Sequence, residues 1–476
     1  MENIIGRKEE ISLLNRLQAS TKSEFVAVYG RRRVGKTYLV RQVFEDQFSF
    51  QMTGVANTPA PQQLTNFHNA LTRLVPSNES AQPPQNWFDA FHKLSLALEQ
   101  QSAGKKILFF DELPWLDTQQ SGFVAALEYF WNAWASARRD VLLIVCGSAA
   151  SWIINELINN KGGLHNRLTE RILLLPFSLA ETEAFLQNKG SQYSRYELIQ
   201  LYMAMGGIPF YLENIQTNRS IHQNIDRMFF TASGLLATEY TNLYRSLFNL
   251  YERHTAVVEA LSLKAKGLTR KDIIAETRLT DGGATTNVLE ELEQSGFIRR
   301  YLPFGKGKGE RAVLYQLTDP FTLFYLTFVK DSKAEGEGAW LSQMDSARWH
   351  AWSGYAFEYL CRYHIQNIKK ALGISGVYTE ISAWRSQKSE KGVQIDLVID
   401  RKDHVINICE MKFSAEPYAI TKAYAENLQH KLWTFKAETA TKKTLFLTLI
   451  TAHGLKTNEY STRLVHDALD LDVLFT

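Results

Sequence analysis

The residue types best suited to binding phosphate stand near the start of the chain. The run FVAVYGRRRVGKT at 25–37 is an apolar stretch that ends in Gly30, four residues, Gly35, Lys36 and Thr37. Glycines let the backbone wrap a phosphate chain with its N–H groups pointing inward, and a lysine ammonium reaches the terminal phosphates. A threonine hydroxyl at this position is suited to holding Mg²⁺. The residues predicted to bind a polyphosphate are Gly30, Arg31, Arg32, Arg33, Val34, Gly35, Lys36 and Thr37.

A second segment carries the acids that such a site needs. Residues 107–112 read ILFFDE, an apolar strand that ends in Asp111 and Glu112. The Asp111 carboxylate is expected to support the metal, and Glu112 to polarise the attacking water. The alternative is a glycine turn and an unrelated buried strand with acidic ends. Because both segments occur in order after apolar strands, the pattern favours nucleotide hydrolysis.

A third group of acids lies in the last quarter of the chain. Asp396 interrupts the apolar run QIDLVI at 394–399, and Glu410 and Lys412 end the run VINICEMK at 405–412. Alternate residues of a strand share a face, so Glu410 and Lys412 point the same way, and a neighbouring strand would bring Asp396 beside them. Glu358, on a predicted helix at 354–361, is a third acid. Such a set can hold Mg²⁺ and direct water at a phosphodiester, or it is a structural or inactivated remnant.

Composition limits the classes of protein. The chain has 476 residues, of which 45% are hydrophobic and 22% charged, and this is ordinary for a soluble protein of about three domains. Lys+Arg 53 against Asp+Glu 50 gives a net charge of +3, so a nucleic-acid site must be a local patch. Three scattered cysteines indicate reduced, buried thiols. Without a signal core or an apolar run that could span a bilayer, we expect a cytoplasmic protein with no membrane partner.

The elements that position the first two segments alternate along the chain. Strands are predicted at 25–29, 48–54, 107–111, 141–146 and 171–176, with helical patterns between them. This alternation implies an α/β fold in which helices cover both faces of a parallel sheet. We expect a core at 1–177, followed by a helical lid at 178–245.

Residues 246–335 have the pattern of a winged helix-turn-helix. Helices are predicted within 256–295, the second capped by Thr269, and strands flank the segment GKGKGE to form a wing. Basic residues gather around the second helix and the wing, namely Lys264, Lys266, Arg270, Lys271, Arg299, Arg300, Lys306, Lys308 and Arg311. This patch would contact DNA phosphates, whereas Glu290, Glu291 and Glu293 on the third helix would repel them and leave only Thr285, Thr286 and Asn287 to face bases. DNA binding and an internal spacer role are both open.

Six segments in order resemble the AAA+/STAND group of P-loop ATPases, in particular its archaeal-type members. They are IIGRKEEISLL at 4–14, YGRRRVGKT at 29–37, LFFDELPWL at 108–116, CGSAASWI at 146–153, GGLHNRLTERILLLPFS at 162–178 and GGIPFYL at 206–212. The resemblance implies ATP and Mg²⁺ as ligands and Ser148 as a γ-phosphate sensor, unless Ser148 caps the next helix. It also implies that Arg167 or Arg171 reaches a neighbouring subunit of a homo-oligomer, unless these arginines form ordinary salt bridges.

The segment 345–476, read as a separate α/β unit with the pattern helix, strand, strand, helix, strand, resembles the PD-(D/E)xK nuclease superfamily. The resemblance implies that Glu358, Asp396 and Glu410 bind Mg²⁺ and that Lys412 stabilises developing charge, although Ile395 stands where the superfamily often has proline. Lys422 and Gln429 on the next helix would touch DNA or lie on a solvated face, and the solvated face is favoured.

The expected fold class is therefore α/β: a P-loop NTPase sheet with a helical lid, a winged helix-turn-helix and a restriction-endonuclease-like domain. The expected function is ATP hydrolysis that controls Mg²⁺-dependent DNA cleavage. The alternative is a nucleotide-dependent switch or scaffold that binds nucleic acid or protein without cutting. A transcriptional regulator is disfavoured by the acidic third helix.

Overall fold

The computed structural model describes the whole chain except residues 1–3, 75–81, 160–161, 165, 306–312, 334–335 and 387–391. The chain forms two compact units, Met1–Pro176 and Phe177–Thr476. The three cysteines, Cys146, Cys361 and Cys409, are free and buried, as predicted. In the described part of the chain, no helix is both long and apolar enough to cross a membrane.

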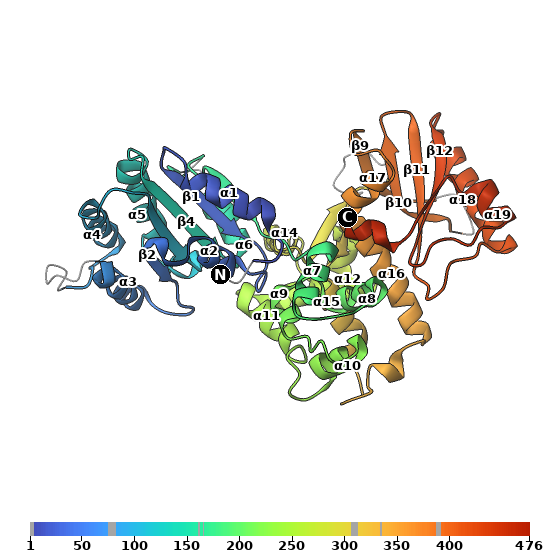
Figure 1. The fold of residues 1–476 in the computed structure, drawn as a ribbon, viewed down its shortest axis with the longest axis horizontal. Coiled ribbons are helices and arrows are strands. Elements are labelled where there is room, and N and C mark those ends of the chain that lie inside the picture. Colours follow the sequence, from blue (N-terminus) through green and yellow to red (C-terminus); the bar gives the residue numbers. More distant parts are fainter. Residues whose placement is uncertain are drawn as a thin grey trace. The chain divides into compact units, whose positions relative to one another are not determined.

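A five-stranded parallel sheet in the order β2-β3-β4-β1-β5 forms the centre of the first unit (Figure 1). Its strands are β1 (Glu24–Tyr29), β2 (Phe48–Thr53), β3 (Lys106–Asp111), β4 (Val141–Gly147) and β5 (Glu170–Leu173). Every residue of β3 and β4 is buried, because helices cover both faces of the sheet. The predicted strands are thus confirmed, except that β5 ends at Leu173, three residues earlier than expected. Pro176, which lacks an N–H, could not have extended the ladder.

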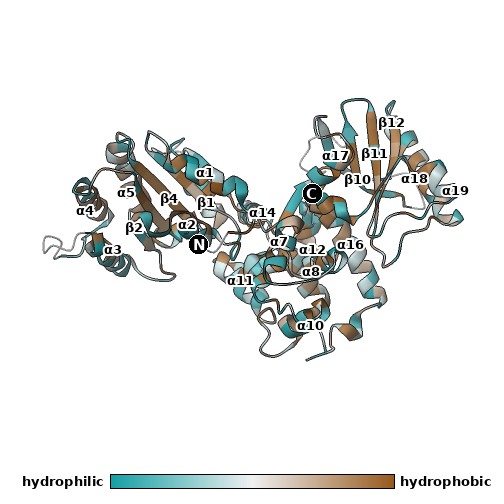
Figure 2. Cartoon of the chain, in the orientation of Figure 1, coloured by the Kyte–Doolittle hydropathy of each residue, from teal (hydrophilic) through white to brown (hydrophobic). Residues whose placement is uncertain are grey.

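The helices of this unit are α1 (Lys8–Gln18), α2 (Lys36–Phe44), α3 (Ala60–Leu74), α4 (Trp87–Glu99), α5 (Phe123–Phe130) and α6 (Ala150–Trp152). Short 3-10 and π segments are η1 (Glu45–Gln47), η3 (Leu113–Trp115), η4 (Trp131–Ala135) and η5 (Ile153–Ile158). Phe67, Trp87, Phe91 and Phe123 pack ring against ring between α3, α4 and α5. This aromatic core fixes the three helices on one face of the sheet, whose strands are apolar in Figure 2.

The second unit begins with helices. They are α7 (Leu179–Asn188), α8 (Arg195–Met205), α9 (Pro209–Glu213), α10 (Ile221–Ile225), η6 (Asp226–Phe230) and α11 (Glu239–Leu247). Reciprocal capping boxes open α7, α8 and α10, with Ser178, Ser194 and Ser220 as the caps. Helix α8 is buried from Leu198 to Met205 except at Gln200, so it is the central helix of this part.

The next segment has the elements predicted for 246–335. They are α12 (Tyr251–Ser262), β6 (Leu268–Thr269), α13 (Arg270–Thr277), α14 (Gly283–Gln294), β7 (Ile298–Tyr301), β8 (Leu314–Leu317), α15 (Pro320–Phe324) and η8 (Tyr325–Val329). Thr269 caps α13, as predicted, with Asp272 as its reciprocal partner. The three strands form an antiparallel sheet in the order β6-β8-β7. Lys306, Lys308 and Arg311 of the expected basic patch lie outside the described residues.

The last segment carries a five-stranded mixed sheet in the order β13-β12-β11-β10-β9. Its elements are η9 (Leu341–Gln343), α16 (Ala347–Tyr363), α17 (Ile365–Ala371), β9 (Thr379–Arg385), β10 (Gln394–Arg401), β11 (Val405–Lys412), α18 (Lys422–Thr439), β12 (Thr444–Thr451), α19 (Glu459–Leu464), β13 (Asp467–Leu469) and η10 (Leu471–Phe475). It has two strands more than the sequence pattern suggested. Arg195 of α8 pairs with Asp472, and Leu179 donates to His364, so this sheet is joined to the preceding helices and is not set apart as a separate unit.

Candidate active site

Two glycines shape the loop between β1 and α2. Gly30 has a φ of 140° and Gly35 a φ of 92°, both in the region that favours glycine. A Cβ on Gly30 would also lie only 2.4 Å from the carbonyl oxygen of Leu174. These positions turn the chain from the sheet into the N-terminus of α2, where a phosphate chain is favourably bound.

Lys36 is folded back into this loop. Its side chain is buried, and Nζ donates to the carbonyl oxygens of Gly30 at 3.0 Å and Arg31 at 2.9 Å. Burial lowers the pKa of Lys36, while nearby acids, Glu112 and Asp111 among them, act to raise it. The ammonium is thus held beneath the loop, where its charge would meet a bound phosphate.

Thr37 and Asp111 face each other across the β1–α2 turn and the end of β3. Thr37 Oγ1 lies 3.0 Å from Asp111 Oδ1 and 2.9 Å from Oδ2. Burial raises the pKa of Asp111, and the Thr37 hydrogen bond opposes that rise. A buried carboxylate beside a hydroxyl oxygen is the donor set that Mg²⁺ prefers, so these residues fit the metal that an ATP site uses.

Glu112 is held by Ser148. Glu112 Oε2 accepts hydrogen bonds from Ser148 Oγ at 2.8 Å and from the Ser148 backbone N–H at 3.3 Å. Glu112 has a φ of 48°, which is uncommon for a residue with a side chain and is found at functional sites. The helix that follows, α6, is capped by Ala149 without a side-chain bond, so the alternative of Ser148 as a helix cap does not describe this structure.

Two further glycines support Glu112, and the sequence reasoning missed them. A Cβ on Gly54 would lie 2.5 Å from the carbonyl oxygen of Glu112, and a Cβ on Gly147 would lie 2.8 Å from Cδ of Pro114. Both follow or end apolar strands next to β3 in the sheet, and that position was the signal available in the sequence. They let the neighbouring strands approach the turn that carries the acid.

The arginines expected near the γ-phosphate lie in different environments. Arg31 is buried in the loop, whereas Arg167 and Arg171 are exposed. Arg167 donates from Nε to the Gly163 carbonyl oxygen at 3.3 Å, and Arg171 stands on the edge strand β5. A role for either arginine in a neighbouring subunit stays a prediction.

The second predicted cluster belongs to the unit Phe177–Thr476. Burial raises the pKa of Glu358 to about 8, and the nearby charges of Asp396 and Glu410 add to that rise, while Arg362 and Lys412 oppose it. The structure therefore brings the four predicted residues, Glu358, Asp396, Glu410 and Lys412, into one electrostatic neighbourhood on α16, β10 and β11.

Partners on α18 hold the central acid of this cluster. The buried Glu410 accepts from Lys431 Nζ at 2.5 Å through Oε1 and from the Tyr424 hydroxyl at 3.0 Å through Oε2. Asp396 accepts from the Gln394 amide, and Lys412 Nζ lies 4.9 Å from the centre of the Tyr424 ring. Across the described residues, no three His, Cys, Asp or Glu side chains are grouped so that they could hold a metal ion.

The favoured prediction for α18 is confirmed, but the sequence analysis missed two residues of this helix that contact the cluster. Lys422 and Gln429 are exposed, which agrees with the favoured solvated-face alternative. Tyr424 and Lys431 are seven positions apart, a spacing that places both on one helix face, and this was the available signal.

A pocket of about 270 Å³ opens beside this cluster. Glu358, Arg362 and Asp396 line it together with Lys266 and Tyr301 from the β6-β8-β7 part of the same unit. Acidic and basic side chains therefore line the same pocket beside the cluster.

Several residues of the expected DNA-binding patch are engaged within the protein. Burial lowers the pKa of Arg299 to about 10, and its guanidinium donates to Gln316. Arg300 pairs with Glu293, and Arg270 with Asp281. Thr285 is buried and donates to the Thr280 carbonyl oxygen, so it does not face outward as expected. These contacts weaken the basic patch as a DNA surface.

Comparison with known proteins identifies the N-terminal part of the chain. Residues 4–215 match the family described as an ATPase domain predominantly from Archaea. This part of the chain is an archaeal-type ATPase domain, and it contains the glycine loop, Asp111 and Glu112.

Individual relatives cover different shares of the chain. An uncharacterized protein of Methanocaldococcus jannaschii is 22% identical over 395 residues, which are 83% of this chain and 83% of that protein. An uncharacterized ATP-binding protein of the same organism is 42% identical over 43 residues, 9% of this chain and 73% of that protein. Among solved structures, a Walker-type ATPase of Pyrococcus abyssi is similar with a TM-score of 0.49 and 17% identity, covering 68% of this chain and 96% of that one. The ORC2 protein of Aeropyrum pernix has a TM-score of 0.41 and 14% identity, covering 73% of this chain and 98% of that one.

Proposed function

We propose that the first unit hydrolyses ATP with Mg²⁺ and that Glu112 is the residue that takes a proton from the attacking water. The supporting observation is the pair of contacts at the end of β3, where Thr37 meets Asp111 and Ser148 meets Glu112. Lys36 and the loop N–H groups bind the β- and γ-phosphates. Thr37 and Asp111 would hold the metal, whose charge would offset the negative charge of the phosphates.

The Ser148 hydroxyl restrains Glu112 before the reaction. Ser148 donates to one of the two carboxylate oxygens of Glu112 and so holds the side chain in place. A bound γ-phosphate offers Ser148 a second acceptor, and Glu112 is then free to turn toward the water. In this way, the binding of ATP itself activates Glu112 as the base.

Binding and turnover measured separately test the proposal. Binding of a fluorescent ATP analogue and release of phosphate are compared for wild type, Lys36→Ala, Glu112→Gln and the exposed control Arg139→Gln. We expect Lys36→Ala to lose binding. Glu112→Gln should keep binding but lose about 10²- to 10⁴-fold in turnover, because only the proton acceptor is removed. A Glu112→Gln protein that hydrolyses ATP at the wild-type rate would refute the assignment of Glu112 as the proton acceptor.

A second candidate function concerns the acidic cluster of the other unit. We propose that it cleaves DNA phosphodiesters with Mg²⁺ under control of the ATPase. The observation that favours it is the raised pKa of Glu358, to about 8, beside Asp396 and Glu410. A divalent cation would relieve this crowding of carboxylates. Binding the cation would require Glu358, Asp396 and Glu410 to move closer together, because the described residues form no group that could hold a metal. It would also require Glu410 to exchange Lys431 for the metal, because Lys431 now neutralises it.

Cleavage assays distinguish this candidate from a scaffold that binds without cutting. Linear, supercoiled, single-stranded and branched DNA are incubated with Mg²⁺ or Mn²⁺, with and without ATP. The proteins are wild type, Lys36→Ala, Glu410→Ala/Lys412→Ala and the exposed control Lys422→Ala. Cutting that is lost only in the double variant supports the nuclease, and the Lys36 variant then reports control by ATP. Protein that hydrolyses ATP but cuts none of these substrates would favour the scaffold.

A further inference from the structure

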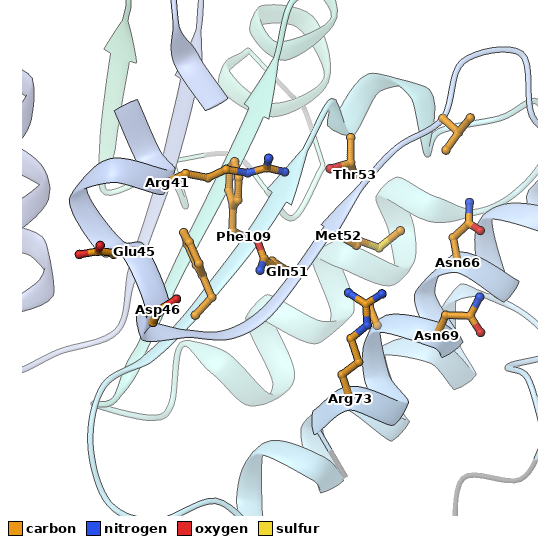
Figure 3. A pocket seen from close by; sticks show the side chains of 13 residues that line it. Arg41, Glu45, Asp46, Gln51, Met52, Thr53, Asn66, Asn69, Arg73 and Phe109 are labelled. Carbon is orange, nitrogen blue, oxygen red and sulfur yellow. The ribbon is translucent and has the colours of Figure 1, made fainter. Parts of the chain in front are cut away.

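Strand β2 is an edge strand of the sheet in the first unit. Strand β2 pairs with β3 on one side and is the last strand of the sheet in the described part of the chain. A cleft of about 680 Å³ runs along it, bordered by α2, η1 and α3 (Figure 3). Backbone N–H and C=O groups on a free edge can accept a further strand.

The walls of this cleft come from opposite faces of the sheet. Phe48 stacks with Phe109, next to Phe44 of α2, whereas Phe50 packs with Phe110 and with Phe67 of α3. Consecutive residues of a strand point to opposite faces, so Phe109 and Phe110 show that α2 and α3 lie on different sides. The register shift between Phe48 and Phe50 explains why these two rings also diverge.

One arginine from each wall lines the cleft. Figure 3 shows Arg41 of α2 and Arg73 of α3 on either side of the strand. Both side chains are exposed, and neither forms an ion pair among the described residues. At the end of the cleft near the start of β2, Glu45 and Asp46 supply negative charge. The charge pattern is therefore basic on both sides along the strand and acidic at one end.

We propose that the β2 edge docks an extended acidic segment of a partner protein. The segment pairs its backbone with β2 and places two consecutive acidic side chains on Arg41 and Arg73. Consecutive side chains are required because the two guanidinium groups lie on opposite faces. A basic residue at the end of the segment meets Glu45 and Asp46. This mode of recognition takes its affinity from main-chain hydrogen bonds and its selectivity from the side chains.

A protein segment suits this surface better than a nucleic acid. A polyanion would gain from Arg41 and Arg73 but would be repelled by Glu45 and Asp46, and it has no amide backbone to continue the sheet. Six residues of β2 span about 20 Å at 3.3 Å per residue, so a segment of six to eight residues covers the edge.

Fluorescence anisotropy with a designed peptide tests the proposal. The probe is a labelled octapeptide of alternating valine and threonine with a central glutamate–aspartate pair and a C-terminal lysine. We expect the wild-type protein to bind it and Arg73→Gln to weaken binding about tenfold, since a charge-assisted hydrogen bond is lost. The exposed Arg139→Gln, outside the cleft, serves as the matched control. Arg73 is the better test residue because the charge of Arg41 also acts on Asp111. ATP turnover of the Arg73 variant should equal that of wild type, and circular dichroism confirms its fold.

Two further probes separate strand pairing from simple charge attraction. Methylation of alternate peptide nitrogens should abolish binding, because it removes the donors that continue the sheet. Equal binding of the methylated peptide would overturn the proposal. So would preferential binding of a single-stranded oligonucleotide that depends on Arg73. If the octapeptide does not bind at all, the charges around β2 act instead to keep other strands away, and the docking site is refuted.

Discussion

His364 should make the second unit less stable as the pH falls. This side chain is buried at the C-terminus of α16. Its Nδ1–H donates to the Leu360 carbonyl oxygen at 3.0 Å, and Nε2 accepts from the backbone N–H of Leu179 at 3.1 Å. Protonation would set an N–H of the ring against the N–H of Leu179. The fold therefore requires the neutral ring.

The size of the effect follows from the pKa. Burial lowers the pKa of His364 from its ordinary value of 6.5 to about 4. Above pH 6.5 the ring is neutral in the folded and unfolded chains, and the stabilisation is fully present. Between pH 6.5 and 4 only the unfolded chain takes up the proton, so the free energy of unfolding falls as the pH falls. At 1.36 kcal/mol per unit, the total loss is about 3 kcal/mol.

Hydrogen exchange measured by mass spectrometry localises this loss. Peptides covering α7 and α16 are followed between pH 7 and 4.5 in wild type, His364→Gln and the exposed control His350→Gln. The glutamine oxygen can still accept from Leu179 but does not titrate. Relative to His364→Gln, wild type should lose about a hundredfold in protection across this range. The same pH dependence in wild type and His364→Gln would refute the reasoning.

Two further predictions concern the candidate sites. Gly147→Ala places a Cβ 2.8 Å from Pro114 and should displace the turn that carries Glu112, so ATP turnover should fall at least about tenfold while binding of the fluorescent analogue changes little. The control is Gly283→Ala, because nothing lies within 4 Å of a Cβ at that position. An unchanged turnover rate in Gly147→Ala would argue against this role of Gly147. Lys431→Met leaves the buried Glu410 without its cation and should lower the unfolding free energy by about 3–5 kcal/mol. Thermal unfolding with and without Mn²⁺, compared with the exposed Lys436→Met, then shows whether a metal can replace the ammonium; a Lys431 variant as stable as wild type would show that the pair contributes nothing.

The sequence was most informative where local chemistry dictates geometry. The spacing of Gly30, Gly35, Lys36 and Thr37 predicted a glycine-shaped turn between a strand and a helix, and the apolar strands before it and before Asp111 predicted the parallel sheet. Capping by Thr269 was also predictable, because a helix start needs an acceptor for its free N–H groups. In each case, residues within a few positions of one another determine the structure.

Contacts between distant segments could not be derived in the same way. Nothing local links Glu410 to Lys431, which is 21 positions away, or Leu179 to His364. The close approach of Gly147 to Pro114 depends on the order of strands in the sheet. The strands β9 and β13 were missed because their sequences contain no continuous apolar run, which agrees with their partial burial in the structure.

The three buried thiols offer a way to follow each part of the molecule separately. Cys146 lies on β4 of the first unit, and Cys361 and Cys409 lie on α16 and β11 of the second. Burial raises the pKa of all three, so the folded protein should resist alkylation. Each thiol becomes reactive only when its own surroundings open. The rate at which a maleimide adds to each thiol therefore measures local opening at that site. A cysteine introduced on the surface would accept a spectroscopic label without interference from the three native cysteines.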